Sequence, residues 1–212
     1  MGTYYQNVEQ YLDRIDPGVW VEIGVERGEG STRWFAEQAA KRNVSHFYAV
    51  DAMQDQADRC RELLKSSGFT DNTTVVHSRG EAFAEDLQKT IGQQKVSLVY
   101  LDNFDWDYWL GQQEEPFVPA QKSKYKTELS IEMNNFNSQL THLAQAINLH
   151  SMLADNCLVI CDDTWFEPAH GVFVGKCSAA IPFLMLASKM QILHHSGYRQ
   201  NSGVILGRFG GQ

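Results

Sequence analysis

Val21-Glu22-Ile23-Gly24-Val25-Glu26-Arg27-Gly28-Glu29-Gly30-Ser31-Thr32 is an apolar strand sequence that runs into three glycines and then into the start of a helix. Such a segment is how an α/β sheet brings its backbone close to a cofactor. One helix length later, Phe47-Tyr48-Ala49-Val50 predicts a second apolar strand, which ends in Asp51. A carboxylate at that point can hold ribose hydroxyls, so the two segments together predict a nucleotide-type cofactor site.

The spacing of the glycines selects among cofactors. A dinucleotide-binding fold needs G-x-G-x-x-G for its pyrophosphate, whereas these glycines follow G-x-x-x-G-x-G. The carboxylates Glu22, Glu26 and Glu29 would repel a pyrophosphate and suit a positively charged cofactor, such as S-adenosylmethionine with its ammonium and sulfonium. At these residues the chain resembles the class I S-adenosylmethionine-dependent methyltransferases, whose first motif is E-x-G-x-x-x-G-x-S/T or close to it.

This resemblance implies an α/β, Rossmann-like fold with a mostly parallel seven-stranded sheet, helices on both faces and an antiparallel strand near the C-terminus. It also implies the cofactor contacts. Glu22 and Gly24 are expected near the methionine end, Asp51 at the ribose and Met53 against the adenine. The full set of expected cofactor-binding residues is Glu22, Gly24, Glu26, Gly28, Ser31, Asp51, Met53, Ser78 and Asp102.

Alternating strand and helix patterns support the same fold class. The expected strands cover 19–23, 46–50, 73–77, 96–101 and 157–161, with a closing pair near 190–196 and 203–209, and the expected helices cover 31–42, 54–66, 81–91, 136–153 and 177–189. This alternation predicts a parallel sheet with helices on both faces. Residues 1–17 are expected to hold an N-terminal helix. The polar, aperiodic segment 103–135 reads as an insertion that forms a lid or acceptor site, or alternatively a flexible or oligomer-forming insertion.

The length and the net charge of the chain limit the kinds of partner that it can bind. With 212 residues the chain fits a single methyltransferase domain, 1–212, and its net charge of −8 argues against nucleic acid or an anionic membrane as a partner. A small-molecule acceptor is the expected partner, and the sequence leaves room for a homo-oligomer. The chain has no apolar stretch long enough to span a bilayer and no signal-peptide pattern at its start, so we expect a cytoplasmic protein.

Two further strands of the predicted sheet end in carboxylates. Asp102 follows the strand 96–101, and the pair Asp162 and Asp163 follows the strand 157–161. Because the carboxyl ends of neighbouring strands line one crevice, these side chains should converge there. Three converging carboxylates repel one another unless a cation lies among them, and Mg²⁺ is the usual occupant of oxygen-rich sites.

These strand endings are similar to those of the metal-dependent small-molecule O-methyltransferases, of the catechol and macrolide-sugar types. The similarity implies that Asp102, Asp162 and Asp163 hold Mg²⁺, which orients a hydroxyl of the acceptor. Alternatively, the carboxylates cap helices or position the cofactor amine without a metal. For the general base, His170 is a candidate because histidine titrates nearest neutrality, and Asp105 is the other candidate.

The sequence therefore predicts an enzyme, a methyltransferase that uses S-adenosylmethionine and Mg²⁺ to methylate a hydroxyl of a small metabolite. Two alternatives stay open: a metal-independent N- or O-methyltransferase of the same fold, and a non-catalytic S-adenosylmethionine-binding protein. An NAD(P)-dependent oxidoreductase is disfavoured by the glycine spacing and the acidic loop.

Overall fold

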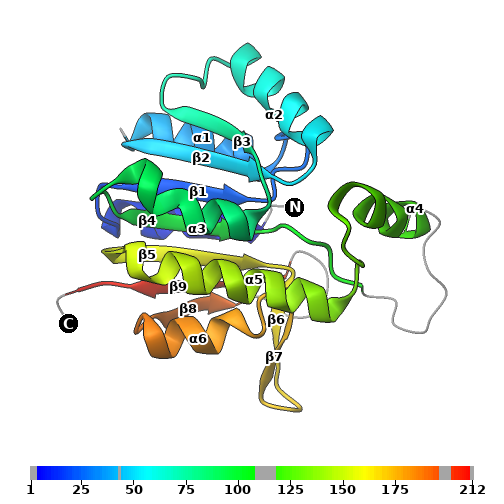
Figure 1. Cartoon of the computed structure of the whole chain (residues 1–212). Helices are drawn as coiled ribbons and strands as arrows, with labels where there is room; N and C mark the ends of the chain where they lie inside the picture. Colours follow the sequence, from blue (N-terminus) through cyan, green and yellow to red (C-terminus); the bar gives the residue numbers. More distant parts are fainter. Residues whose placement is uncertain (1–3, 43, 108–117, 196–201, 211–212) are drawn as a thin grey trace.

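Seven strands of the described residues form a twisted sheet in the order β3-β2-β1-β4-β5-β9-β8, with the last two strands paired antiparallel (Figure 1). The computed structural model describes residues 4–42, 44–107, 118–195 and 202–210. The strands are β1 (Val19–Ile23), β2 (His46–Asp51), β3 (Thr73–His77), β4 (Val96–Leu101), β5 (Leu153–Asp162), β8 (Gln191–His195) and β9 (Gly203–Arg208). Strands β1 to β5 pair in parallel and β9 runs antiparallel to both of its neighbours, which confirms the predicted fold class.

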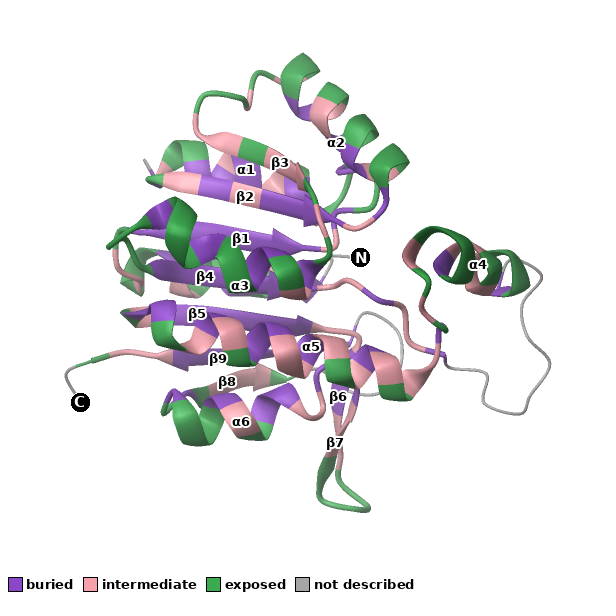
Figure 2. Ribbon diagram, in the orientation of Figure 1, coloured by how far each residue is buried: buried purple, intermediate pink, exposed green. Residues whose placement is uncertain are grey.

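Helices cover both faces of the sheet, as Figures 1 and 2 show. They are α1 (Ser31–Lys41), α2 (Gln54–Ser66), α3 (Gly80–Ile91), α5 (Asn135–Leu149) and α6 (Ala180–Ala187). Strand β1 shows why both faces need a cover. Successive side chains of a strand point to opposite faces of the sheet, and β1 carries apolar side chains on both. Val21 and Ile23 pack with α3, α5 and α6, whereas Trp20 packs on the other face with α1 and α2. Both faces of β1 are therefore buried.

The first helix of the chain is η1 (Tyr4–Arg14), which is wound as a 3-10 helix. The sequence predicted a helix here from its apolar spacing, and Tyr4, Val8 and Leu12 are indeed buried against the sheet. The spacing predicted which side chains are buried; it does not distinguish a 3-10 from an α-helical hydrogen-bond pattern, because both wind with about three to four residues per turn.

Several elements were not predicted. The segment after β5 forms a hairpin of β6 (Thr164–Glu167) and β7 (Val172–Gly175). The insertion contains α4 (Val118–Lys124) and a π-helical turn, η2 (Tyr125–Leu129). The predicted helix 136–153 is divided into α5 and the short η3 (His150–Met152), and β5 begins at Leu153, earlier than predicted. No helix in the described part of the chain is long and apolar enough to cross a membrane.

A glycine brings the ends of β1 and β4 into contact. Gly24 has a φ of +99°, and a Cβ at this position would lie 2.5 Å from the backbone nitrogen of Asn103. Only glycine combines that backbone conformation with so close an approach. The loop after β1 and the residues after β4 are thereby held side by side at one edge of the sheet.

One carboxylate of the predicted cofactor motif lies inside the core. Glu22 is fully buried in β1, on the face that α1 and α2 cover. Burial raises the pKa of Glu22 to about 8, although the hydroxyls of Ser31 and Thr32 lower it in part. The side chain is therefore largely protonated in the folded protein at neutral pH.

Glu22→Gln should stabilise the fold at pH 7 by about 2 to 3 kcal/mol, because each pKa unit corresponds to about 1.4 kcal/mol. Glu22 has a pKa raised from 4.5 to about 8, so its contribution to stability declines as the pH rises from 4.5 to 8. Urea unfolding at pH 4 and pH 7 measures the effect, with the exposed Glu62→Gln as a control. The advantage should vanish at pH 4; an equal gain at both pH values would contradict the raised pKa.

Candidate active site

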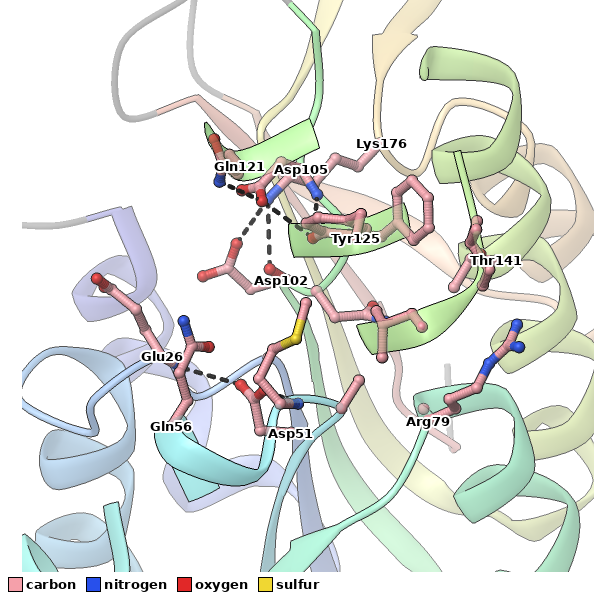
Figure 3. A pocket seen from close by; sticks show the side chains of 18 of the residues that line it. Glu26, Asp51, Gln56, Arg79, Asp102, Asp105, Gln121, Tyr125, Thr141 and Lys176 are labelled. Carbon is pink, nitrogen blue, oxygen red and sulfur yellow. Dashed lines mark hydrogen bonds and ion pairs between the residues drawn. The ribbon is translucent and has the colours of Figure 1, made fainter. Parts of the chain in front are cut away.

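A cavity of about 430 Å³ opens at the carboxyl ends of β1, β2, β4 and β5 (Figure 3). Gly24 and Glu26 line it from the loop after β1, and Asp51 from the end of β2. Asp102 and Asp163 line it from the ends of β4 and β5. This edge is where ligands bind in open α/β sheets.

Asp51 organises the wall of the cavity that the glycine loop forms. Its Oδ2 accepts hydrogen bonds from the backbone N–H groups of Val25 (3.1 Å) and Glu26 (3.2 Å), and its Oδ1 accepts one from Met53 (2.8 Å). Burial raises the pKa of Asp51, while these three donors lower it in part. A carboxylate has about four acceptor positions, so Asp51 retains one for a ligand hydroxyl.

The other expected cofactor residues divide into two groups. Gly24, Glu26, Met53 and Asp102 line the cavity, as Asp51 does, whereas Glu22, Gly28, Ser31 and Ser78 do not. Gly28 faces the buried thiol of Cys60, and the Ser78 hydroxyl donates to the carbonyl of Arg79 at 3.1 Å. The start of α3 contributes residues that the sequence did not indicate, namely Arg79, Gly80 and Glu81.

The three strand-end aspartates meet as predicted. Carboxylate oxygens of Asp102, Asp162 and Asp163 all lie within 4.8 Å of one another. The Tyr100 hydroxyl lies beside them and donates to Asp102 Oδ2 at 3.4 Å. Parallel pairing of β4 with β5 accounts for this convergence, because it brings Leu101 opposite Cys161 and so aligns the two strand ends.

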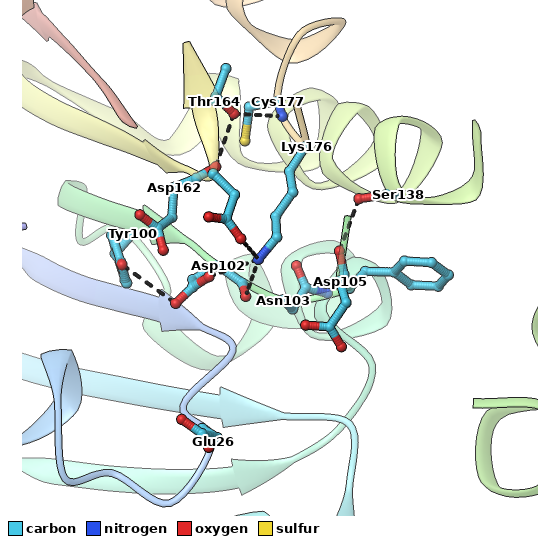
Figure 4. A network of polar contacts seen from close by, with 12 residues as sticks. Glu26, Tyr100, Asp102, Asn103, Asp105, Ser138, Asp162, Thr164, Lys176 and Cys177 are labelled. Carbon is cyan, nitrogen blue, oxygen red and sulfur yellow. Dashed lines mark hydrogen bonds and ion pairs between the residues drawn. The ribbon is translucent and has the colours of Figure 1, made fainter. Parts of the chain in front are cut away.

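A lysine that the sequence did not indicate lies among these carboxylates (Figure 4). The ammonium nitrogen of Lys176 is 2.9 Å from Asp102 Oδ1 and 3.0 Å from Asp163 Oδ2. It also donates to the backbone carbonyl of Asp102 at 3.3 Å, and its side chain is only 3% exposed. An ammonium has three donors, and each of them has an acceptor here.

The cluster does not fit the Mg²⁺ that the resemblance implied. Mg²⁺ demands near-octahedral oxygen ligands at about 2.0 to 2.1 Å and keeps several waters. The Lys176 ammonium already contacts one oxygen of Asp102 and one of Asp163. A divalent ion bound to these oxygens would lie against a second, buried cation, which is unfavourable in the interior of a protein.

The pKa values of the cluster are shifted by burial and by the neighbouring charges. Burial raises the pKa of Asp162 well above its usual range, and the neighbouring charges of Asp102 and Asp163 raise it further. Burial alone would lower the pKa of Lys176, but the attraction of the surrounding carboxylates outweighs it and holds that pKa well above its ordinary value. The surroundings therefore favour the charged form of Lys176 and the neutral form of Asp162.

The hairpin of β6 and β7 brings Lys176 to this place. Thr164 pairs with Gly175, so the next residue along β7 reaches the acidic end of β5. Gly175 has a φ of +115°, and a Cβ there would lie 2.0 Å from the carbonyl oxygen of Asp163. The N–H of Lys176 donates to that same oxygen at 3.2 Å, which fixes the backbone from which its side chain extends.

His170, a predicted base, lies elsewhere. It is exposed in the turn between β6 and β7, at the tip of the projecting hairpin, and does not line the cavity (Figure 2). Pairing of β6 with β7 carries the turn away from the sheet edge where the aspartates meet. The structure therefore gives His170 no contact with the candidate site, and its expected role as the base is corrected on this ground.

Asp105, the other predicted base, does line the cavity. Its Oδ2 accepts hydrogen bonds from the Tyr125 hydroxyl at 2.9 Å and from the Gln121 amide, and its backbone N–H donates to the Tyr125 oxygen at 3.0 Å. Both partners come from the insertion, so Asp105 connects the end of β4 to the segment that covers it (Figure 3).

The insertion lies over the cavity along the described part of its length. Tyr125 packs with Met53, Phe104 and Met133 in a small apolar cluster. Lys124 forms an ion pair with Asp55 at the start of α2, with distances of 3.0 and 3.2 Å to its two oxygens. Residues 108–117 of the predicted lid lie outside the described residues. In the part of the insertion that follows them, five residues line the cavity, namely Gln121, Lys124, Tyr125, Leu129 and Ile131.

Two comparisons of sequence match part of the chain. A family model for a methyltransferase domain matches residues 21–109. A protein named "Probable protein arginine N-methyltransferase 6" from Arabidopsis thaliana is 35% identical over 79 residues, which are 37% of this chain and 17% of that protein. The chain thus spans less than a fifth of this relative.

Solved structures share the whole fold at low identity. A Streptococcus mutans protein in complex with SAH has a TM-score of 0.60 and 8% identity, covering 98% of each chain. An rRNA methylase from Streptococcus thermophilus has a TM-score of 0.57 and 10% identity, covering 99% of this chain and 98% of its own. TrmK of M. capricolum in complex with S-adenosylhomocysteine (SAH) has a TM-score of 0.52 and 13% identity, covering 95% of this chain and 66% of its own.

The matched residues contain the glycine loop, Asp51 and Asp102, which line one side of the cavity. The likeness to the solved structures is one of fold, and it extends over nearly the whole chain. The methyltransferase-domain model thus matches the first half of the chain, and the fold of the chain is shared with solved structures of two proteins in complex with S-adenosylhomocysteine.

Proposed function

We propose that the protein is an S-adenosylmethionine-dependent methyltransferase and that it methylates a small acceptor, which binds between the acidic strand ends and the insertion. The observation that carries this proposal is that both halves of the candidate site line the same cavity. Asp51 and the glycine loop form its cofactor side, and Asp105 with the insertion forms the opposite side. A volume of about 430 Å³ lies at the low end of the range of ligand pockets, about 300 to 1,000 Å³, which favours a small acceptor.

Methyl transfer requires little covalent help from the protein. The lone pair of the acceptor attacks the methyl carbon of the sulfonium, the carbon–sulfur bond breaks, and its electron pair stays on sulfur in S-adenosylhomocysteine. The acceptor also loses a proton, to a nearby carboxylate or to water. The contribution of the protein is to hold the two reactants in line. Asp105 is our candidate for the proton acceptor, because it is the cavity carboxylate fixed between β4 and the insertion.

A hydroxyl of a small metabolite is the first candidate acceptor, as the similarity to the O-methyltransferases suggests. An amine is the second, because Glu26, Glu81 and Asp105 give the cavity wall carboxylates that attract a cation. The arginine methyltransferase relative lends this second candidate some support, although the similarity covers only 79 residues. The expected Mg²⁺ is left out of the proposal, because Lys176 contacts the carboxylates that would bind it.

Activity is tested with methyl-labelled S-adenosylmethionine and two matched panels of acceptors, small hydroxylated compounds and small amines. Transfer to either panel supports the proposal and selects between the two candidates. Tight binding of S-adenosylhomocysteine with no transfer to any acceptor would instead favour a non-catalytic binding protein.

Asp51→Ala should weaken binding of S-adenosylhomocysteine by about 10-fold or more, because a hydrogen bond to a charged group contributes about 1.5 to 3 kcal/mol. The variant also removes the acceptor that orders the backbone at Val25 and Glu26. Calorimetric titration measures the affinity. Asp58→Ala, at an exposed carboxylate of α2 outside the cavity lining, should leave it unchanged. Equal affinity of Asp51→Ala and the unaltered protein would show that Asp51 does not hold the ribose.

Binding of S-adenosylhomocysteine should slow hydrogen exchange in α4 and η2 of the insertion, by several-fold or more. The insertion packs on Met53 and borders the same cavity, so a ligand there adds contacts to it. Hydrogen-exchange mass spectrometry with and without ligand measures the change, and the exposed β6–β7 turn serves as an internal control. Protection at residues 24–28 and 51–53 without any at 118–131 would contradict a lid role.

A further inference from the structure

We propose that the Lys176 ammonium is the resident cation of the acidic cluster and that methyl transfer at this site proceeds without a bound divalent metal. The second part of this inference, methyl transfer without a metal, rests on the proposed function. The first part, that the ammonium takes the place of a metal ion, concerns only Lys176 and the three aspartates. It concerns the place where the sequence predicted Mg²⁺.

The contacts of the ammonium are those of an ion bound in a built site. Two of its acceptors are carboxylate oxygens from different strands, Asp102 Oδ1 and Asp163 Oδ2, at 2.9 and 3.0 Å. The third is the carbonyl of Asp102 at 3.3 Å. Because these acceptors saturate the three donors, the nitrogen has no unmet hydrogen bond that would draw it toward solvent.

Displacing the lysine would be costly. Its side chain is 3% exposed, and removing its charge would take away the cation that lies between the carboxylates of Asp102 and Asp163. Removing one partner of a buried ion pair destabilises a protein, because the other partner loses its counter-charge. A divalent ion entering the cluster would have to offset this cost as well as its own loss of water.

The backbone on either side of Lys176 is also fixed. Gly175 packs on the backbone of Asp163, and the N–H of Cys177 donates to Thr164 Oγ1 at 3.0 Å (Figure 4). The lysine therefore extends from a point held by the hairpin on one side and by the start of the α6 segment on the other. Its position is part of the fold and does not depend on a flexible loop.

The absence of a bound metal would also restrict the chemical classes of acceptor that the site can methylate. A divalent metal lowers the pKa of a bound hydroxyl because it places two positive charges directly on the oxygen. A single ammonium that is already paired with two carboxylates cannot do the same. The acceptor should therefore be a nucleophile that reacts without such help, namely an amine or a hydroxyl that is itself acidic.

The test is a titration of Mn²⁺ into chelator-treated protein, with and without S-adenosylhomocysteine, followed by calorimetry and by the electron paramagnetic resonance signal of free Mn²⁺. The unaltered protein and Lys176→Arg should bind no stoichiometric Mn²⁺ up to millimolar concentration. Lys176→Ala should gain one Mn²⁺ site with a dissociation constant at least 10-fold below that limit. Adding Asp163→Asn to Lys176→Ala should abolish the gained site.

Stoichiometric Mn²⁺ binding by the unaltered protein that Asp163→Asn removes would overturn the proposal. A folded Lys176→Ala variant that binds no metal would also overturn it, since the ammonium would then not be what excludes the ion. If Lys176→Ala does not fold, the titration of the unaltered protein still tests whether the cluster binds a divalent metal. Once an acceptor is known, methyl transfer should be unchanged by chelator. Absence of S-adenosylhomocysteine binding would contradict the proposed function alone, because the Mn²⁺ titration is read without it.

Discussion

The ion pairs of Lys176 with Asp102 and Asp163 are the interaction on which the rest of the active site depends. They join the ends of β4 and β5 to the β6–β7 hairpin, and they do so in a place where a charge without a partner would be strongly unfavourable. Asp102 in turn precedes Asn103, against whose backbone Gly24 packs, so the same contacts hold the strand ends beside the glycine loop. The glycine loop and the acidic strand ends are thus parts of one connected arrangement.

Much of the fold was readable from the sequence because each strand is a short apolar run with turn residues after it. The boundaries of β1, β3 and β4 match the predicted strands, and β9 is antiparallel as expected. The convergence of Asp102, Asp162 and Asp163 followed from the same reasoning, since parallel strands deliver the residues after them to one edge. The structure of the insertion was not predictable, because its polar sequence has no period and its packing rests on single contacts such as Tyr125 with Asp105.

The error at His170 and the omission of Lys176 have a common origin. His170 is a candidate base on chemical grounds alone, because histidine titrates nearest neutrality. Two four-residue runs, Thr164–Glu167 and Val172–Gly175, flank the turn Pro168–Gly171, and equal strands around a turn are a hairpin signal. This hairpin register puts His170 at the tip of the hairpin and Lys176 beside Asp163. The pairing of the strands thus favours Lys176 as a residue of the site, whereas side-chain chemistry alone favours His170.

The hairpin register also determines which insertions and deletions this protein can tolerate during evolution. Residues 168–171 form an exposed turn, so lengthening or shortening it would leave the pairing of Thr164 with Gly175 intact. A single-residue insertion or deletion within β7 would have a different effect, because a slip of one residue turns every following side chain to the opposite face of the hairpin. Insertions and deletions in related chains should therefore accumulate at the turn and be rare between it and Lys176.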